Sequence, residues 1–192
     1  MEKLTGLNKL RTAVFISGTG SNFKNLIKFC KTKKTPISIN LVISNIHKAT
    51  GLKYADQINI KKKVFNFKDI KDTEKKILAL LKKEKINFIC LAGFMKILPK
   101  KITKKFSGKI INIHPSLLPK YKGLNTHRRA LANKDKFAGC TVHYVTEKLD
   151  SGKIIMQKKI KVTAKDSVAS LAKKVLKQEH KLYPAAIMKI FN

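Results

Sequence analysis

The sequence predicts an α/β domain in which a mostly parallel sheet is covered by helices on both faces. Short apolar runs rich in Ile, Val and Phe alternate with longer segments whose apolar residues recur at helical spacing. That alternation is typical of strands joined by right-handed helical crossovers. The 192 residues suit one domain, and no Pro-, Gly- or Ser-rich linker divides them. We therefore expect a single domain over 1–192, with 1–11 as a loose N-terminal extension.

Five short apolar segments are expected to form the parallel part of the sheet. They span residues 13–16, 39–43, 64–67, 86–92 and 109–114. After the first of them, Phe23, Leu26, Ile27 and Cys30 lie at positions i, i+3, i+4 and i+7, which predicts an amphipathic helix. A second helix is expected around Ile77, before the fourth strand. Ligands of such sheets bind at the carboxyl ends of the strands.

The C-terminal part has a different pattern. Residues 141–145 and 154–162 are expected to form a hairpin-like antiparallel pair across the loop 146–153. A final helix follows, with Asp166 as its expected N-cap. Because proline lacks a backbone N–H, we expect Pro184 to end or kink this helix.

The net charge is strongly positive. The 43 Lys and Arg residues outnumber 11 Asp and Glu residues, which gives a formal charge of +32. One explanation is a polyanionic partner such as nucleic acid; the other is a compositional bias toward Lys that has no binding role. Only Arg11, Arg128 and Arg129 carry the planar guanidinium that base readout favours. The second explanation is therefore preferred, and no specific nucleic-acid partner is expected.

The cysteines and the N-terminus bear on the compartment. The chain has an odd number of cysteines, namely Cys30, Cys90 and Cys140. Their spacing is not that of a metal site, and each lies in or beside an apolar run. They are interpreted as buried thiols in a reducing compartment. No apolar signal region opens the chain, and no run of about 18 apolar residues could cross a bilayer. We expect a cytoplasmic protein without a membrane partner.

A loop rich in small residues follows the first strand. Residues 17–22, Ser-Gly-Thr-Gly-Ser-Asn, lead directly into the first amphipathic helix. Glycines allow close approach of the backbone to a ligand, and the free N–H groups at a helix start favour phosphate. The alternative is an ordinary tight turn in which Ser21 or Asn22 caps the helix.

The fifth strand becomes polar at its end. Asn112 and His114 lie two residues apart, so their side chains share one face of the strand, and Pro115 then ends it. An amide donor beside a group that can carry positive charge is what an acyl transfer needs for its oxyanion. A strand end that merely binds loop backbone would have the same sequence, so this alternative stays open.

Four separated motifs resemble those of the phosphoribosylglycinamide formyltransferase family. They are Ser-Gly-Thr-Gly-Ser-Asn at 17–22, Leu-Ala-Gly-Phe-Met at 91–95, Asn-Ile-His-Pro-Ser-Leu-Leu-Pro at 112–119 and Leu-Asp-Ser-Gly at 149–152. The resemblance extends from about residue 12 to residue 183. It implies a formyltransferase-type, Rossmann-like sheet with C-terminal antiparallel strands.

The resemblance also implies an activity. A formyl group would pass from 10-formyltetrahydrofolate, the co-substrate, to the amine of 5-phosphoribosyl glycinamide in de novo purine biosynthesis. Only these small molecules are implied as partners, no metal is needed, and the chain would act as a monomer or homodimer.

The matching positions imply residue roles. The catalytic residues would be Asn112, His114 and Asp150. The substrate phosphate would lie on Gly20, Ser21 and Asn22, and its glycinamide end on Glu179. The folate site would comprise Met95, Lys96, Ile97, Leu98, Asn112, Thr146, Glu147, Lys148, Leu149 and Asp150. Asn112 and a protonated His114 would stabilise the oxyanion, and we expect the Asp150 carboxylate to raise the pKa of His114.

Some positions depart from the family pattern. Thr19 replaces a common Asn, and Lys96 replaces a common Arg, so a forked contact to folate would become a single ammonium contact. Asn125 and the stretch near Lys71 also differ.

Three other functions share features with this chain. Methionyl-tRNA formyltransferase and formyltetrahydrofolate hydrolase share the Asn, His and Asp residues, but each normally carries a further domain for which this chain is expected to have no room. A basic RNA-binding module would need interleaved aromatic residues, yet aromatics are 7% of the chain.

Overall fold

A computed structural model describes residues 9–191. Most of the expected N-terminal extension, residues 1–8, lies outside the described residues. The expected extension is too long, since residues 10 and 11 are not part of it. Leu10 and Arg11 already belong to the first strand and pair with Ile37 and Ser38 of the second. Backbone pairing in a parallel ladder holds these two residues in the sheet.

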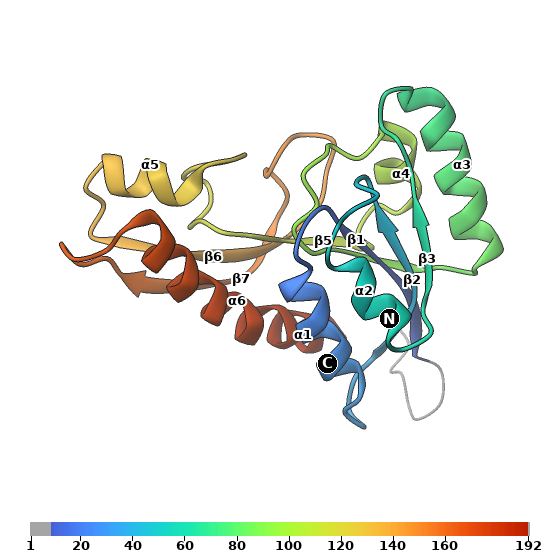
Figure 1. Ribbon diagram of the computed structural model, residues 1–192, viewed down its shortest axis with the longest axis horizontal. Coiled ribbons are helices and arrows are strands. Elements are labelled where there is room, and N and C mark those ends of the chain that lie inside the picture. Colours follow the sequence, from blue (N-terminus) through green and yellow to red (C-terminus); the bar gives the residue numbers. More distant parts are fainter. Residues whose placement is uncertain (1–8, 192) are drawn as a thin grey trace.

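The core is one seven-stranded sheet with the order β3-β2-β1-β4-β5-β6-β7 (Figure 1). The first five strands are parallel, and β6 and β7 are antiparallel, as expected. The strands are β1 (Leu10–Ile16), β2 (Ile37–Ser44), β3 (Lys61–Val64), β4 (Phe88–Leu91), β5 (Ile110–His114), β6 (Phe137–Tyr144) and β7 (Ile154–Lys161).

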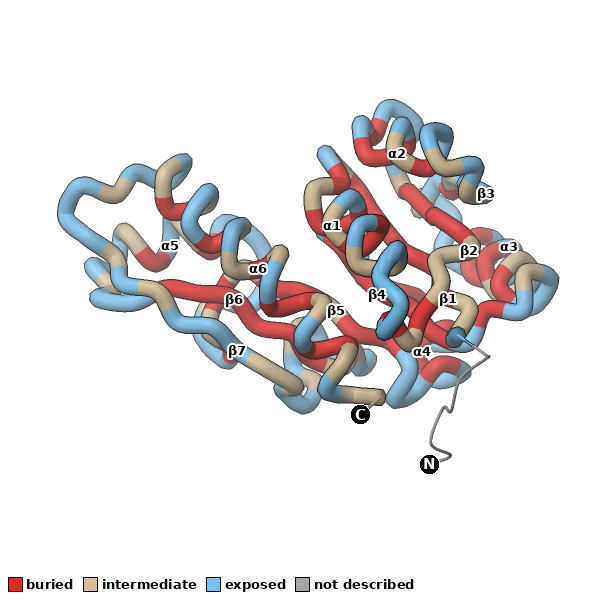
Figure 2. The backbone as a smooth tube through the Cα atoms, turned by 90° about the horizontal axis from the view of Figure 1, so that it is seen from below, coloured by how far each residue is buried: buried red, intermediate tan, exposed pale blue. Residues whose placement is uncertain are grey.

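Helices cover both faces of this sheet, as the alternation predicts. They are α1 (Ser21–Cys30), α2 (Leu52–Asp56), α3 (Ile70–Lys83), α4 (Lys100–Lys105), α5 (Thr126–Ala132) and α6 (Val168–Phe191). Alternate residues of β1 face opposite sides: Val14 packs in the cluster with α1 and α6, whereas Phe15 packs in the cluster with α3 and α4. Figure 2 shows the central strands as the buried layer between these helices.

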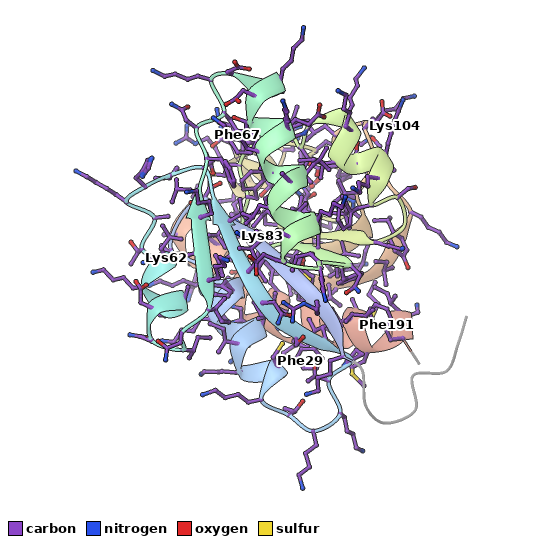
Figure 3. The ribbon with its side chains drawn as sticks, turned by 90° about the vertical axis from the view of Figure 1, so that its right-hand side faces the viewer. Phe29, Lys62, Phe67, Lys83, Lys104 and Phe191 are labelled. Atoms are coloured by element: carbon purple, nitrogen blue, oxygen red, sulfur yellow. The ribbon has the colours of Figure 1, made fainter. Side chains whose placement is uncertain are left out.

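Both edge strands carry exposed lysines. The third strand was expected at 64–67, but it lies at 61–64, and Lys61, Lys62 and Lys63 are all exposed. Figure 3 shows Lys62 on this strand, and Lys83 and Lys104 on the neighbouring helices. Charged edges discourage the addition of a further strand, so apolar content is a poor guide to an edge strand.

Of the two outcomes expected at Pro184, an end or a kink of the last helix, the structure excludes the end. A proline at this position cannot donate to the carbonyl of His180, four residues earlier. That carbonyl instead accepts a hydrogen bond of 2.6 Å from the Asn25 side chain of α1. The helix therefore continues to Phe191.

The start of the same helix also differs from the expectation. Ser167, not Asp166, accepts the capping bond, from the Ser170 backbone N–H at 3.1 Å. The Asp166 carboxylate instead accepts from the Thr163 backbone N–H and the Ser170 hydroxyl, both at 2.8 Å. It thus orders the turn before the helix.

The cysteines are free thiols. Cys90 and Cys140 are buried as expected, whereas Cys30 is only partly buried. Burial raises the pKa of Cys30 to about 11 and that of Cys140 to about 12. Within residues 9–191, the helices are too short or too polar to cross a bilayer.

Tyr183 connects the last helix to the centre of the sheet. Its side chain is fully buried, and its hydroxyl lies 2.9 Å from the Leu91 carbonyl and 3.2 Å from the Ile111 carbonyl. These carbonyls belong to β4 and β5, next to the end of the sheet where Asn112 lies. The hydroxyl has one hydrogen, so it donates to one or the other of these carbonyls and bonds α6 to the sheet in a place that is fully buried.

We predict that Tyr183→Phe lowers the free energy of unfolding by about 0.5–1.5 kcal/mol, because it removes a buried hydrogen bond between α6 and the sheet. Urea unfolding measures the change. Tyr54→Phe, in the partly buried α2, is the control and should change stability by less than half as much. Equal effects of the two substitutions would contradict the role given to the Tyr183 hydroxyl.

Candidate functional site

A cavity of about 560 Å³ lies where β4 and β5 end. Its lining includes seven of the predicted site residues: Met95, Lys96, Ile97, Asn112, His114, Leu149 and Asp150. A smaller cavity of about 70 Å³ shares Lys96, Asn112 and Asp150 with it and adds Leu98 and Thr146–Lys148. Every residue predicted for the folate site therefore lines at least one of two cavities with common walls.

The change of strand direction at β5 places the catalytic candidates. Asn112 and His114 end this strand, and in the antiparallel register they lie opposite His143 and Thr141 of β6. Thr141 Oγ1 donates to the Ser116 carbonyl at 2.6 Å, which fixes the chain as it leaves β5. Asp150 lies in the loop between β6 and β7.

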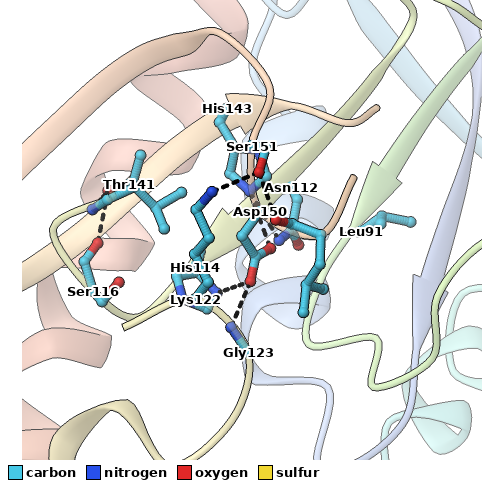
Figure 4. A network of polar contacts seen from close by, with 12 residues as sticks. Leu91, Asn112, His114, Ser116, Lys122, Gly123, Thr141, His143, Asp150 and Ser151 are labelled. Carbon is cyan, nitrogen blue, oxygen red and sulfur yellow. Dashed lines mark hydrogen bonds and ion pairs between the residues drawn. The ribbon is translucent and has the colours of Figure 1, made fainter. Parts of the chain in front are cut away.

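Asn112, His114 and Asp150 come together, as Figure 4 shows. His114 Nδ1 lies 3.4 Å from Asp150 Oδ2, and that same oxygen accepts a 2.8 Å bond from the Gly123 backbone N–H. Asn112 reaches the group through His143: its Nδ2 is 3.2 Å from His143 Nε2, which lies 3.6 Å from Asp150 Oδ1. The polar groups form one connected network at the cavity wall.

The sequence analysis did not single out His143. Its Nδ1 lies 2.8 Å from the Tyr144 carbonyl, so Nδ1 carries the hydrogen and Nε2 is free to accept from the Asn112 amide. His143 therefore orients the amide and leaves the second amide hydrogen of Asn112 available. The sequence does carry one signal for His143, because a histidine stands there within an alternating strand pattern, and its side chain is buried in the structure. Its contact with Asn112 depends on the register between β5 and β6.

The charge state of His114 differs from the expectation. Burial lowers the pKa of His114, and the Tyr121 carbonyl and Asp150 carboxylate, which raise it, offset only part of this effect. The Asp150 carboxylate raises the pKa as expected, but the loss of hydration outweighs this charge, so His114 is less protonated at neutral pH than the sequence analysis implied. For Asp150, burial raises the pKa, but the approach of His143, the bond from the Gly123 N–H and the charge of His114 outweigh it and lower the pKa overall. At neutral pH the carboxylate is ionised beside a mostly neutral imidazole.

The glycine loop has the shape expected for an anion site. Gly20 has φ 71°, and its Cα lies against Gly51, whose N–H donates to the Gly18 carbonyl at 3.0 Å. A Cβ on either Gly20 or Gly51 would collide with the other residue. No side-chain cap closes α1, so the expected alternative, a turn capped by Ser21 or Asn22, is not the arrangement found. The N–H groups of the first turn are therefore available to a ligand.

Asn22 and Glu179 form a second buried polar group. Asn22 Nδ2 donates to Glu179 Oε2 at 2.7 Å, and Asn22 Oδ1 is buried with no partner among the described residues. Burial raises the pKa of Glu179, and the bond from Asn22 lowers it only in part. An unpaired amide oxygen beside a buried carboxyl group indicates a site for a polar ligand.

The four predicted substrate residues, Gly20, Ser21, Asn22 and Glu179, do not line either cavity. Ser17 connects the two regions. Its Oγ accepts from the Met95 backbone N–H at 2.7 Å, and its own N–H donates to the Gly93 carbonyl at 3.1 Å. The end of β1, which begins the glycine loop, is thus bonded to the cavity wall.

Residues 9–191 contain no group of three or more His, Cys, Asp or Glu side chains arranged to hold a metal ion.

A family model described as "Formyl transferase" matches residues 10–187. Among curated proteins, the chain is 42% identical over 180 residues to the phosphoribosylglycinamide formyltransferase of Haemophilus influenzae, covering 92% of this chain and 85% of that protein. It is 43% identical over 182 residues to the human trifunctional purine biosynthetic protein adenosine-3, covering 93% of this chain but 18% of that protein.

Solved structures with the same name are also similar. The phosphoribosylglycinamide formyltransferase of Brucella melitensis has a TM-score of 0.89 and 43% identity, with 95% of each chain covered. That of Bacillus halodurans has a TM-score of 0.91 and 32% identity, also with 95% of each chain covered.

We predict that Glu179→Gln stabilises the fold more at pH 7.5 than at pH 4. The unfolded carboxyl ionises near its ordinary pKa of 4.5, whereas folded Glu179 holds its proton to higher pH, so folding becomes less favourable as the pH rises. Glutamine keeps an acceptor for Asn22 and does not titrate. Urea unfolding at the two pH values measures the difference, with exposed Glu147→Gln as the control. A Glu179→Gln effect that does not change with pH would contradict the buried-acid interpretation.

Proposed function

The chain belongs to the formyl transferase family, and from that premise we propose that it transfers a formyl group from 10-formyltetrahydrofolate to the amine of 5-phosphoribosyl glycinamide. The observation that supports this most directly is the meeting of Asn112, His114 and Asp150 at the wall of the main cavity. The reaction serves de novo purine biosynthesis. The buried free thiols suit the cytoplasm, and the chain acts as a single catalytic domain on small molecules alone.

The two substrates approach from different sides of the β5 end. The phosphate of the glycinamide substrate binds the N–H groups of the glycine loop, with Gly20, Ser21 and Asn22 around it. Glu179 and the unpaired Oδ1 of Asn22 contact its polar groups. The folate occupies the two connected cavities, where exposed Met95 and Ile97 supply apolar surface and the Lys96 ammonium is available to a carboxylate.

The chemistry follows from the groups at the cavity wall. The neutral amine attacks the formyl carbon, a carbon–nitrogen bond forms, and the carbonyl oxygen gains negative charge. The free amide hydrogen of Asn112 and the positive charge of protonated His114 stabilise that oxygen, and a preorganised donor such as the amide contributes on the order of 10²–10³ in rate. The bond from the formyl carbon to the folate nitrogen then breaks; the amine loses a proton and the folate nitrogen gains one.

Asp150 makes this possible at neutral pH. Burial favours neutral His114, but the ionised carboxylate 3.4 Å away stabilises the imidazolium when His114 takes a proton. Because His114 is buried, the charge of this imidazolium acts on the oxyanion more strongly than the charge of an exposed histidine would. Asp150 also lines the cavity, so we assign its carboxylate as the acceptor of the proton that the amine loses.

We predict that His114→Ala and Asp150→Ala each lower kcat by about 10²–10⁴ while the fold is retained. The assay mixes the protein with both substrates and follows folate deformylation by absorbance. His47→Ala, an exposed position away from the cavities, is the control and should keep normal kcat. Turnover that does not require the glycinamide substrate, or near-normal kcat in either variant, would contradict the proposal.

We predict that Ser21→Glu raises KM for the glycinamide substrate at least about tenfold, because a carboxylate at the start of α1 repels phosphate. KM for the folate should change little. Ser21→Ala, which keeps the backbone N–H groups and adds no charge, should have a much smaller effect. An unchanged KM in Ser21→Glu would exclude a phosphate site on this loop.

A further inference from the structure

The ring of His114 is held from the side opposite Asp150 by a backbone carbonyl. Its Nε2 lies 2.9 Å from the carbonyl oxygen of Tyr121. Because a carbonyl oxygen can only accept, Nε2 must carry the hydrogen, and neutral His114 has its lone pair on Nδ1. The nitrogen that takes up a proton is thus the one that faces Asp150. This assignment depends on where the Tyr121 carbonyl points.

The backbone at Tyr121 is in a conformation that an aromatic residue seldom adopts. Its φ is 57°, in the left-handed region, which is unfavourable for a residue other than glycine. Gly123 and Asn125, further along the same loop, also have positive φ. Contacts of the Tyr121 side chain must offset this cost for the carbonyl to stay on His114.

Those contacts come from the end of α5 and the turn after it. The Tyr121 hydroxyl donates to Asp135 Oδ2 at 2.8 Å and accepts from Asn133 Nδ2 at 2.9 Å. The Arg129 guanidinium lies 5.0 Å from the centre of the Tyr121 ring and donates to the Lys122 carbonyl at 2.7 Å. The anchoring residues Arg129, Asn133 and Asp135 do not line the main cavity.

We propose that Tyr121 and Asp135 are positioning residues for His114. Their hydroxyl–carboxylate bond holds the Tyr121 carbonyl on Nε2 and so keeps Nδ1 as the atom that carries the mobile proton toward Asp150. The kinetic consequence rests on the proposed function, but the position of the hydrogen on the ring can be observed without turnover. A merely structural tether would stabilise the loop without affecting that hydrogen.

The charged groups around the ring define the expected pH effect. Besides burial, which lowers the pKa of His114, the loop carbonyl and Asp150 raise it, and the charges of His143 and Arg129 lower it. His127, on α5, is the other titratable group close by; burial first, and the charge of His114 second, lower the pKa of His127. Loss of the loop carbonyl therefore lowers the pKa of His114 further.

The test compares Tyr121→Phe with the wild-type protein in two measurements. In ¹⁵N NMR of labelled histidines, His114 should change from a single Nε2–H form to a mixture of both tautomers. In the transfer assay, kcat should fall about tenfold or more with little change in either KM, since a small displacement of a reacting group has a large kinetic effect. Because the transfer uses protonated His114, the alkaline limb of the kcat profile should move to lower pH.

Variants of Asp135 provide the matched comparison. Asp135→Ala removes the acceptor and should reproduce the effects of Tyr121→Phe, whereas Asp135→Asn keeps an acceptor for the hydroxyl and should restore most of kcat. Lys120→Ala is the control, because it removes the 3.1 Å ion pair to Asp135 but leaves the bond to Tyr121. It should keep the wild-type tautomer and kcat.

The outcomes separate the two proposals. A wild-type tautomer and pH profile in both Tyr121→Phe and Asp135→Ala overturns the positioning role, even if both variants are less stable. If Tyr121→Phe does not fold, the pair Asp135→Ala and Asp135→Asn decides, and equal behaviour of these two overturns it. A wild-type protein that shows no transfer refutes the proposed function, while the NMR comparison still tests the role of Tyr121.

Discussion

The change from parallel to antiparallel pairing at β5 fixes the position of nearly every polar group in the site. This strand pairs with β4 in one direction and with β6 in the other, so its polar end lies beside the middle of a neighbouring strand. That arrangement sets His143 opposite Asn112 and brings the loop of Asp150 back over the end of β5. A slip of one residue in this register would turn Asn112 and His114 to the other face of the sheet.

The positive charge has a structural pattern. Lysines line both edges of the sheet, where they discourage association through strand pairing. The few acidic residues are mostly engaged: Glu84, Asp56 and Asp135, for example, each pair with a lysine. The excess is therefore a solvated lysine surface. The proposed substrates carry phosphate and carboxylate groups, so this field would modestly accelerate their encounter, an effect that salt would screen.

The sequence was informative where structure follows local periodicity. The parallel strands other than β3, together with α1 and α3, could be located from their apolar spacing, and the loop at 17–22 and the polar end of β5 could be selected as candidate sites. Short helices such as α2 and α4, of five and six residues, were not expected, because they are too short to show an amphipathic repeat.

The remaining features depend on tertiary contacts. The partner of Asn112 is set by strand register, the conformation of Tyr121 by a carboxylate beyond α5, and the pKa of His114 by a balance between burial and charge. None of these has a local signature in the sequence. The catalytic roles of Asn112, His114 and Asp150 remain predictions, although the structure brings the three side chains together.

The hydrogen bond from Asn25 to the carbonyl of His180 has a consequence for how this chain tolerates change. Because this bond replaces the one that Pro184 cannot make, α6 reaches Phe191, whose ring packs edge-on against Phe88 at 5.3 Å between centroids. The asparagine and the proline are therefore interdependent, although 159 positions separate them (184 − 25). With another residue at 184, the backbone N–H of that residue would compete with the Asn25 amide for the His180 carbonyl. Without Asn25, this carbonyl would lose its donor, because Pro184 has no N–H. The effects of substitutions at these two positions on the free energy of unfolding should be non-additive, so that a change at one position alters the cost of a change at the other.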